Sequence, residues 1–335
     1  MPTTSAAVST VMHERKPVRG SIVWWLRFFG IAAFVILLLR LPSTEQIQLE
    51  RIDLRWLGFC MLLTVLQLLL DAAVWQWMLS AQRIRHPYPK TVLSYLASQY
   101  LGLVTPGHVG EFLAAGYISM NTGITFGYAL SSVMMKKLIN WAVLFGFGIW
   151  GLGLLVQIPA KYGVQRIVIA SLAVLVVLAL GIGLWVLSLR WLAKKWQRLS
   201  PWQVEMAEFW SGFRHLASPG LALPVVLAAS AFSLLFFQLN AVLRALGVNL
   251  PILLVGQIVA VSRIVARLLP ISVVGFGSKD AAVIELLRQQ GIHPAVGLAA
   301  TLLLLLCSYF VTLLLSAVSW WVKPLVIRRA RTASS

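Results

Sequence analysis

Charged residues are scarce in this chain of 335 residues, and acidic residues are the scarcest. Asp and Glu together number 10 against 28 Lys and Arg, and 59% of the chain is hydrophobic. With a mean hydropathy of +0.85, this composition excludes a soluble globular domain and predicts an all-α polytopic membrane protein. The net charge of +18 would also suit nucleic-acid binding. However, the basic residues fall in short loops between apolar spans, so we attribute them to membrane topology and anionic lipids and expect no nucleic-acid partner.

Residues typical of catalytic and metal sites are also few. The chain has two cysteines and five histidines, and none shows the spacing of metal ligands or of a disulfide framework. Cys60 and Cys307 both lie in apolar stretches. The sequence contains no nucleotide-binding loop and no Gly-x-Ser-x-Gly motif. We therefore expect no catalytic residues, no metal and no cofactor, and we expect that the protein is not an enzyme.

Long apolar segments divide the chain into membrane spans. We predict spans at residues 22–41, 56–80, 126–158, 167–189, 221–245 and 294–322. Between the fourth and fifth spans, residues 200–217 begin with a capping pattern, and their aromatic and aliphatic residues recur at helical spacing. This pattern predicts an interfacial helix that lies along the membrane surface.

Two stretches, residues 91–119 and 252–290, interrupt the apolar pattern with a proline, glycines and then an acid. A helix over residues 91–104 would be about 21 Å long, which is shorter than the hydrocarbon core of about 30 Å. We therefore predict two re-entrant hairpins. Interrupted segments in corresponding places of two halves point to the binding site of a transporter. The break residues are Pro106, Gly107, His108, Gly110 and Glu111 in the first stretch, and Pro270, Ser272, Gly275, Gly277, Lys279 and Asp280 in the second.

The distribution of Lys and Arg predicts the topology. If both hairpins are re-entrant, most basic residues between the spans lie inside, and both termini are cytoplasmic. Each half then has three spans with a hairpin between the second and third, and an odd number of spans makes the two halves inverted repeats. The expected parts are a cytoplasmic tail (1–21), two membrane repeats (22–160 and 165–322) and a basic cytoplasmic tail (323–335).

Several charged residues fall within the membrane segments. Each would cost about 2.5–3.5 kcal/mol at the centre of a lipid-facing helix, so we expect them to face one another or a wet cavity. Glu111 and Asp280 could simply cap the helices that they begin. Alternatively, the helix starts and the nearby cations bind an anionic headgroup. The candidate site residues are Arg263, Arg267, Glu111, Asp280, Lys279, His108 and Ser272, with Asp71, Lys136 and Lys137 as secondary candidates.

The two breaks together resemble the flippase-like family typified by the transmembrane domain of lysylphosphatidylglycerol synthase. The motifs are Pro-Gly-x-x-Gly-Glu from Pro106 and Pro-x-Ser-x-x-Gly-x-Gly-x-basic-acid from Pro270. The resemblance covers roughly residues 20–322 and implies movement of a lipid between leaflets in a bacterial inner membrane. The chain departs from the family pattern at His108, at Asp280 and at Lys136-Lys137, where the family often has a basic residue, a glutamate and an acid–arginine pair.

The leading hypothesis is therefore a lipid flippase without ATP hydrolysis of its own. Its partners would be membrane lipids, namely an anionic phospholipid or a polyprenyl-phosphate-linked lipid. One alternative is a membrane-embedded enzyme that acts on a lipid headgroup. Another is a non-catalytic membrane partner of an enzyme that makes lipids or glycans.

Overall fold

The computed structural model describes residues 52–104, 111–157, 200–216, 219–268, 272–273 and 276–322. In this part of the chain, four helices are long and apolar enough to cross a membrane. They are α2 (Leu54–Ala81), α5 (Phe126–Gln157), α8 (Ala222–Ala245) and the composite helix Pro294–Val322. The helical membrane architecture is thus confirmed, and these helices match four of the six predicted spans. The spans predicted at 22–41 and 167–189 lie outside the described residues.

Two pairs of short helices flank the predicted breaks. The first pair is α3 (Tyr88–Val104) and α4 (Leu113–Thr122), and the second is α9 (Ile252–Leu268) and α10 (Ser278–Gln289). The longest of the four has 17 residues, or about 26 Å, so none is as long as the hydrocarbon core is thick. Between α9 and α10, the two-residue strands β1 (Ser272–Val273) and β2 (Phe276–Gly277) pair antiparallel.

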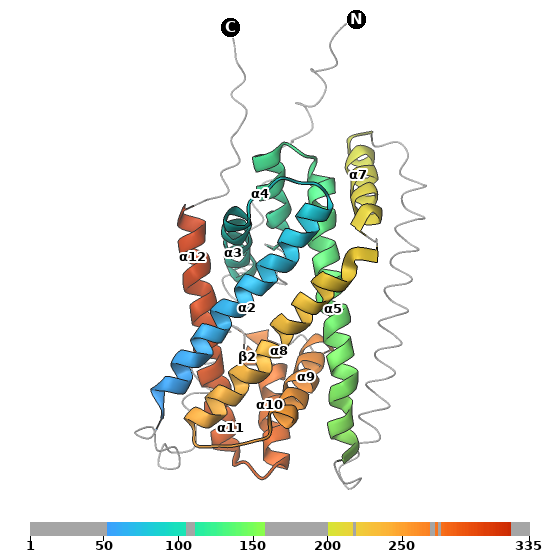
Figure 1. Cartoon of the computed structure of the whole chain (residues 1–335). Helices are drawn as coiled ribbons and strands as arrows, with labels where there is room; N and C mark the ends of the chain where they lie inside the picture. Colours follow the sequence, from blue (N-terminus) through green and yellow to red (C-terminus); the bar gives the residue numbers. More distant parts are fainter. Residues whose placement is uncertain are drawn as a thin grey trace, which may run out of the picture.

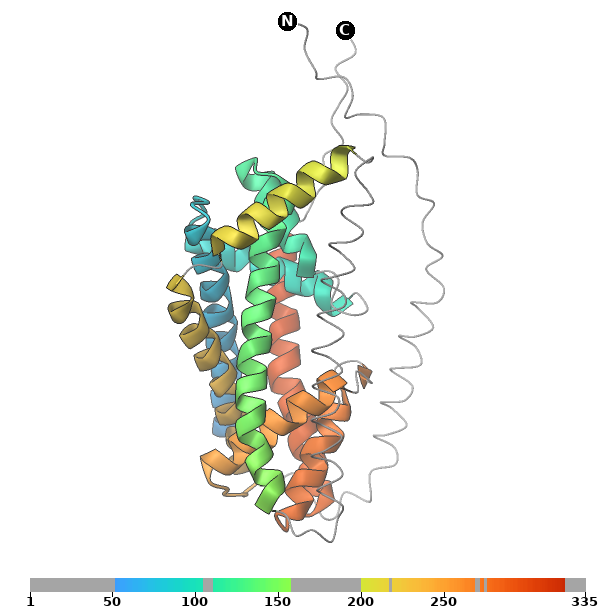
Figure 2. The ribbon, with the colours of Figure 1, turned by 90° about the vertical axis from the view of Figure 1, so that its right-hand side faces the viewer.

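The long helices α2 and α8 lie side by side and antiparallel across the face of the molecule that is in front in Figure 1. The Asp53 N–H at the start of α2 donates to the Ala245 carbonyl at the end of α8, at 3.2 Å. Further along, Gln238 Nε2 donates to Gln67 Oε1 at 2.8 Å. The pair α3 and α4 lies toward one end of these helices, and α9 and α10 lie toward the other (Figures 1 and 2).

The last span is one continuous helix with a wider turn inside it. It consists of α11 (Pro294–Leu305), the π-helical segment η6 (Leu306–Phe310) and α12 (Val311–Val322). Cys307 of η6 is buried beside Cys60 of α2, and both are free thiols. At the far end of the span, Trp320 stacks on Tyr100 of α3 with ring centroids 6.1 Å apart.

The helix predicted at residues 200–217 is present as α7 (Ser200–Leu216) and packs across the start of α5 and the end of α2 (Figure 2). The Gly127 N–H of α5 donates to the Glu205 carboxylate, and His215 Nε2 lies 3.0 Å from the Ala81 carbonyl oxygen. Gly212 faces Ser131 so closely that a side chain there would overlap the Ser131 hydroxyl. A one-turn 3₁₀ helix, η5 (Pro219–Leu221), then leads into α8.

Helix α9 runs against the second half of α5 because glycines on α5 leave room for it. Gly148 meets Ile264, and Gly151 meets Ala260 and the Gln257 carbonyl group. Small residues at helix interfaces let backbones approach closely in membranes. This packing fixes the position of α9 and therefore of the charged residues that it carries.

We predict that Gly148→Ala destabilises the protein by about 1–3 kcal/mol, because the added methyl overlaps Ile264 Cδ1 and Cγ1. Gly146→Ala is the matched control. Nothing lies within 4 Å of its added methyl, so alanine should be neutral or stabilising by up to about 1 kcal/mol. Unfolding in detergent micelles measures the change in stability of both variants. Adding Ile264→Ala should partly restore the stability that Gly148→Ala loses. Equal effects of the two glycine substitutions would contradict this packing.

Candidate functional site

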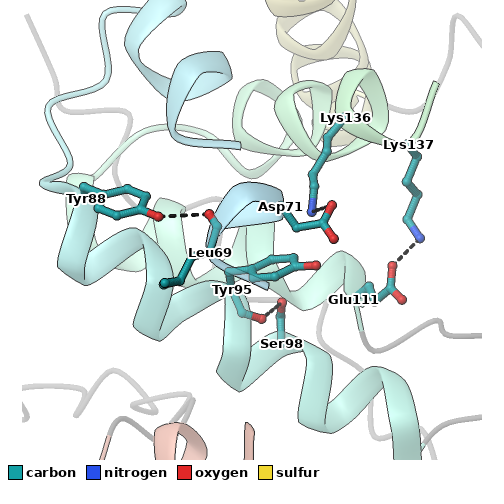
Figure 3. Close-up of polar contacts among 8 residues, drawn as sticks. All are labelled: Leu69, Asp71, Tyr88, Tyr95, Ser98, Glu111, Lys136 and Lys137. Carbon is teal, nitrogen blue, oxygen red and sulfur yellow. Dashed lines mark hydrogen bonds and ion pairs between the residues drawn. The ribbon is translucent and has the colours of Figure 1, made fainter. Parts of the chain in front are cut away.

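An ion pair joins the middle parts of α2 and α5. Lys136 Nζ lies 3.5 Å from Asp71 Oδ1, and their side chains are only 10% and 17% exposed. The same ammonium group sits over the Tyr95 ring of α3, 3.8 Å from its centroid. Asp71 and Lys136 were only secondary candidates in the sequence, and the structure brings them together with an aromatic ring (Figure 3).

A second pair lies next to the first break. Lys137 Nζ is 2.6 Å from Glu111 Oε2, and the pair is partly exposed (Figure 3). Lys137 also lies 4.9 Å from the centroid of the Phe112 ring. Gly102 near the end of α3 packs directly against Glu111, since an added Cβ would stand 2.8 Å from Glu111 Cγ. Glu111 is therefore held between α3 and α5. Asp71, Lys136, Glu111 and Lys137 are called the lysine–carboxylate cluster below.

The second break carries what we call the arginine cluster: Arg263 and Arg267 on α9, and Lys279 and Asp280 at the start of α10. Lys279 Nζ lies 3.3 Å from Asp280 Oδ1, and Asp280 is fully buried. Asp280 Oδ2 accepts the Gly277 N–H at 2.9 Å, which caps α10 as the structural interpretation of this acid predicted. Arg263 is half-buried and interacts electrostatically with both Arg267 and Asp280.

The two clusters reach the same stretch of α5. Arg267 is exposed, and its guanidinium carbon lies 6.0 Å from the centroid of the Trp141 ring. Trp141 is four residues after Lys137, so the two residues share one face of α5 about one turn apart. The residues that border the two breaks, Glu111 and Arg267, therefore approach α5 at adjacent turns, near the middle of this 32-residue helix.

The structure describes only some of the other predicted site residues. Pro106, Gly107, His108, Gly110, Pro270 and Gly275 lie outside the described residues. Ser272 lies in β1, where its backbone pairs with Gly277 of β2. Three aromatic residues at the clusters were not predicted from the sequence. They are Tyr95, Phe112 and Trp141, and only their closeness to cations in space distinguishes them from ordinary apolar residues.

The two arginines give this arrangement groups that can bind an anion. Among the described residues, no three His, Cys, Asp or Glu side chains come together as a metal site. Each carboxylate of the two clusters has a lysine within 4.0 Å, whereas neither arginine has a carboxylate at that distance in the described part of the chain. The arginines are therefore the groups with charge to offer a ligand.

We predict that Asp71→Asn lowers the free energy of unfolding by about 3 kcal/mol, because it leaves the Lys136 ammonium buried without its counter-charge. Glu285→Gln is the matched control. It breaks the 2.8 Å pair with Arg288 on α10, whose side chains are about half exposed, and such surface pairs contribute about 0.2–1 kcal/mol.

Chemical or thermal unfolding of the purified protein in micelles gives both values. The double variant Asp71→Asn/Lys136→Met removes both charges, so it should recover most of the loss. A double variant no more stable than Asp71→Asn alone would show that the pair is not coupled.

Comparison with known proteins adds one finding. The sequence profile of the family described as "Lysylphosphatidylglycerol synthase TM region" matches residues 22–316, and this range contains all the residues of both clusters. No curated protein and no solved structure matches the chain. A match of this extent, together with four helices long and apolar enough to cross a membrane, indicates a multi-pass membrane protein with a lipid-related function. The chain belongs to the lysylphosphatidylglycerol synthase transmembrane-region family.

Proposed function

We propose that the protein is a lipid flippase of the bacterial inner membrane and not an enzyme. It moves an anionic phospholipid or a polyprenyl-phosphate-linked lipid between leaflets. The headgroup crosses through a polar cavity between two re-entrant hairpins, α3–α4 and α9–α10, while the acyl chains stay in the lipid. The observation that carries the proposal is the arginine cluster, which places cations beside a helix break in the middle of a membrane protein.

The role proposed for Arg263 and Arg267 is to bind the phosphate of the headgroup. Their four-residue spacing places both guanidinium groups on one face of α9. A guanidinium group presents a planar fork of donors that matches phosphate oxygens. The lysine–carboxylate cluster lies one turn of α5 away from Trp141, which Arg267 contacts. Its ion pairs can rearrange when a headgroup passes. The Lys137–Glu111 pair and the Arg267–Trp141 contact lie at adjacent turns of α5, which supports a continuous path.

Helix contacts support the proposed inverted repeat. Helix α5 contacts α9 of the second hairpin, and α12 contacts α3 of the first. The corresponding helices α2 and α8 contact each other antiparallel, as two elements on a pseudo-two-fold axis would. The repeats also end their hairpins alike, since Gly123 after α4 and Gly291 after α10 both adopt positive φ, at 73° and 79°.

The position of α7 supports the proposed topology. Its contacts with Ala81 and Gly127 place α7 at the same end of the molecule as the end of α2 and the start of α5. The basic segment 83–90 follows α2 at that end. Helix α7 and the basic segment 83–90 would then lie on the same cytoplasmic face. This placement agrees with the rule that basic residues are enriched on the cytoplasmic side.

Reporter fusions test the topology. Fusions after residues 50, 88, 163, 205 and 335 should report outside, inside, outside, inside and inside. The expectation follows from the Lys and Arg distribution together with the contact of α7 with the end of α2. A fusion after residue 205 that reports outside would rule out the re-entrant assignment of the first hairpin.

Transport itself is tested with purified protein in liposomes that carry fluorescently labelled lipids in one leaflet. The wild type should speed the exchange of a labelled anionic lipid. Arg263→Gln and Arg267→Gln should each slow it at least about tenfold, because a lost charge-assisted bond to phosphate is worth about 1.5–3 kcal/mol. Arg288→Gln is the control, since Arg288 pairs with Glu285 on the exposed face of α10.

Thermal unfolding of each variant separates loss of the site from loss of the fold. Arginine variants that fold and transport normally would contradict the phosphate-binding role. Folded wild-type protein that moves no lipid would contradict the flippase proposal. It would favour a membrane partner of a lipid-making enzyme or, if a headgroup is altered in the liposomes, an enzyme.

A further inference from the structure

The charges at the two clusters are unequal in number. In the two clusters, cations outnumber carboxylates by two, which leaves two positive charges beside the middle of α5. The cations are Lys136, Lys137, Arg263, Arg267 and Lys279, and the carboxylates are Asp71, Glu111 and Asp280.

The excess charge belongs to the arginines. Lysines lie 3.5 Å from Asp71, 2.6 Å from Glu111 and 3.3 Å from Asp280, so each carboxylate is already neutralised by a neighbour. A cationic headgroup would therefore have to displace a lysine in order to reach a carboxylate. Arg263 and Arg267 can accept an anion without breaking an ion pair among the described residues.

We propose that the site takes a headgroup with two negative charges, as a phosphomonoester or as two adjoining phosphates of a diphosphate. This inference rests on the proposed lipid transport and names its substrate class. A phosphomonoester carries about −1.5 to −2 at pH 7 and leaves the loaded site almost neutral. A phosphodiester such as phosphatidylglycerol leaves one positive charge, and a zwitterion leaves two. The lipid in the family description, phosphatidylglycerol with an attached lysine, would increase the excess of positive charge at the site.

The geometry of the arginines agrees with this charge count. Positions 263 and 267 are about 6 Å apart along α9, so their guanidinium groups can bind different oxygens of one phosphate or of two linked ones. Arg267 is exposed beside Trp141, and Arg263 is half-buried nearer to Asp280. The outer arginine meets the headgroup first, and the inner one holds it where water is scarcer. Because residual charge is costly in such surroundings, affinity should follow the charge that remains after binding.

Thermal stabilisation of the full-length protein in detergent tests this preference independently of transport. The probes are phosphatidate, phosphatidylglycerol and phosphatidylcholine with identical acyl chains, at about pH 8, where a phosphomonoester is fully ionised. Phosphatidate should stabilise the protein at a concentration at least about tenfold lower than phosphatidylglycerol, and phosphatidylcholine should be weakest. Inorganic phosphate and diphosphate form a separate arm. Both should bind more weakly than phosphatidate, and a soluble ion that binds as tightly would overturn the lipid assignment.

Variants change the number of charges in a defined way. Arg267→Gln leaves one excess charge, which phosphatidylglycerol neutralises and phosphatidate exceeds, so the preference for phosphatidate should be lost or reversed. Arg288→Gln, which removes an exposed arginine of α10, should keep the wild-type preference. Equal or stronger binding of phosphatidylglycerol to the wild type overturns the inference and leaves the flippase proposal intact. A preference for phosphatidate in protein that moves no lipid supports the charge assignment and contradicts the flippase proposal.

Discussion

The absence of water in the hydrocarbon core is the constraint on which the rest of this structure depends. A charge or a free backbone group inside the bilayer must find its partner within the protein. The pair between Asp71 and Lys136 satisfies this requirement between α2 and α5. At the second break, β1 pairs with β2 and the Asp280 carboxylate accepts the Gly277 N–H. At the second break, protein groups therefore serve as hydrogen-bond partners in place of solvent.

The same constraint makes close helix packing necessary. Gly148 and Gly151 bring α9 against α5, and Gly102 brings Glu111 against the end of α3. These contacts carry charged residues on separate elements toward one stretch of α5. These glycines therefore determine where the charged side chains lie. A larger residue at one of them would shift a charged residue that it does not itself replace.

Local features of the sequence predicted the elements well but not how they pair. Runs of apolar residues bounded by Gly and Pro predicted α2, α5, α8 and the last span to within a few residues, because length and hydropathy decide them. Asp71 was noticed because a carboxylate in a span is costly. Its partner Lys136 lies 65 positions later in the sequence. Contacts between residues so far apart depend on tertiary packing, which local sequence patterns do not reveal. Trp141 was missed because an aromatic residue on a membrane helix looks the same whether it faces lipid or a guanidinium group.

The π-helical segment η6 sets the rotation of everything that follows it in the last span. An α-helix turns by about 100° per residue, so one additional residue in a wider turn changes which side chains face inward. Past η6, Ser316 and Ser319 are buried, and Trp320 stacks on Tyr100. Leu306 and Phe310 of η6 are exposed, so their side chains are interchangeable with other apolar ones. The number of residues in η6 cannot change in the same way, because a one-residue deletion would turn Trp320 away from α3. At the exposed positions of η6, the length of the chain is therefore more constrained than the choice of apolar side chain.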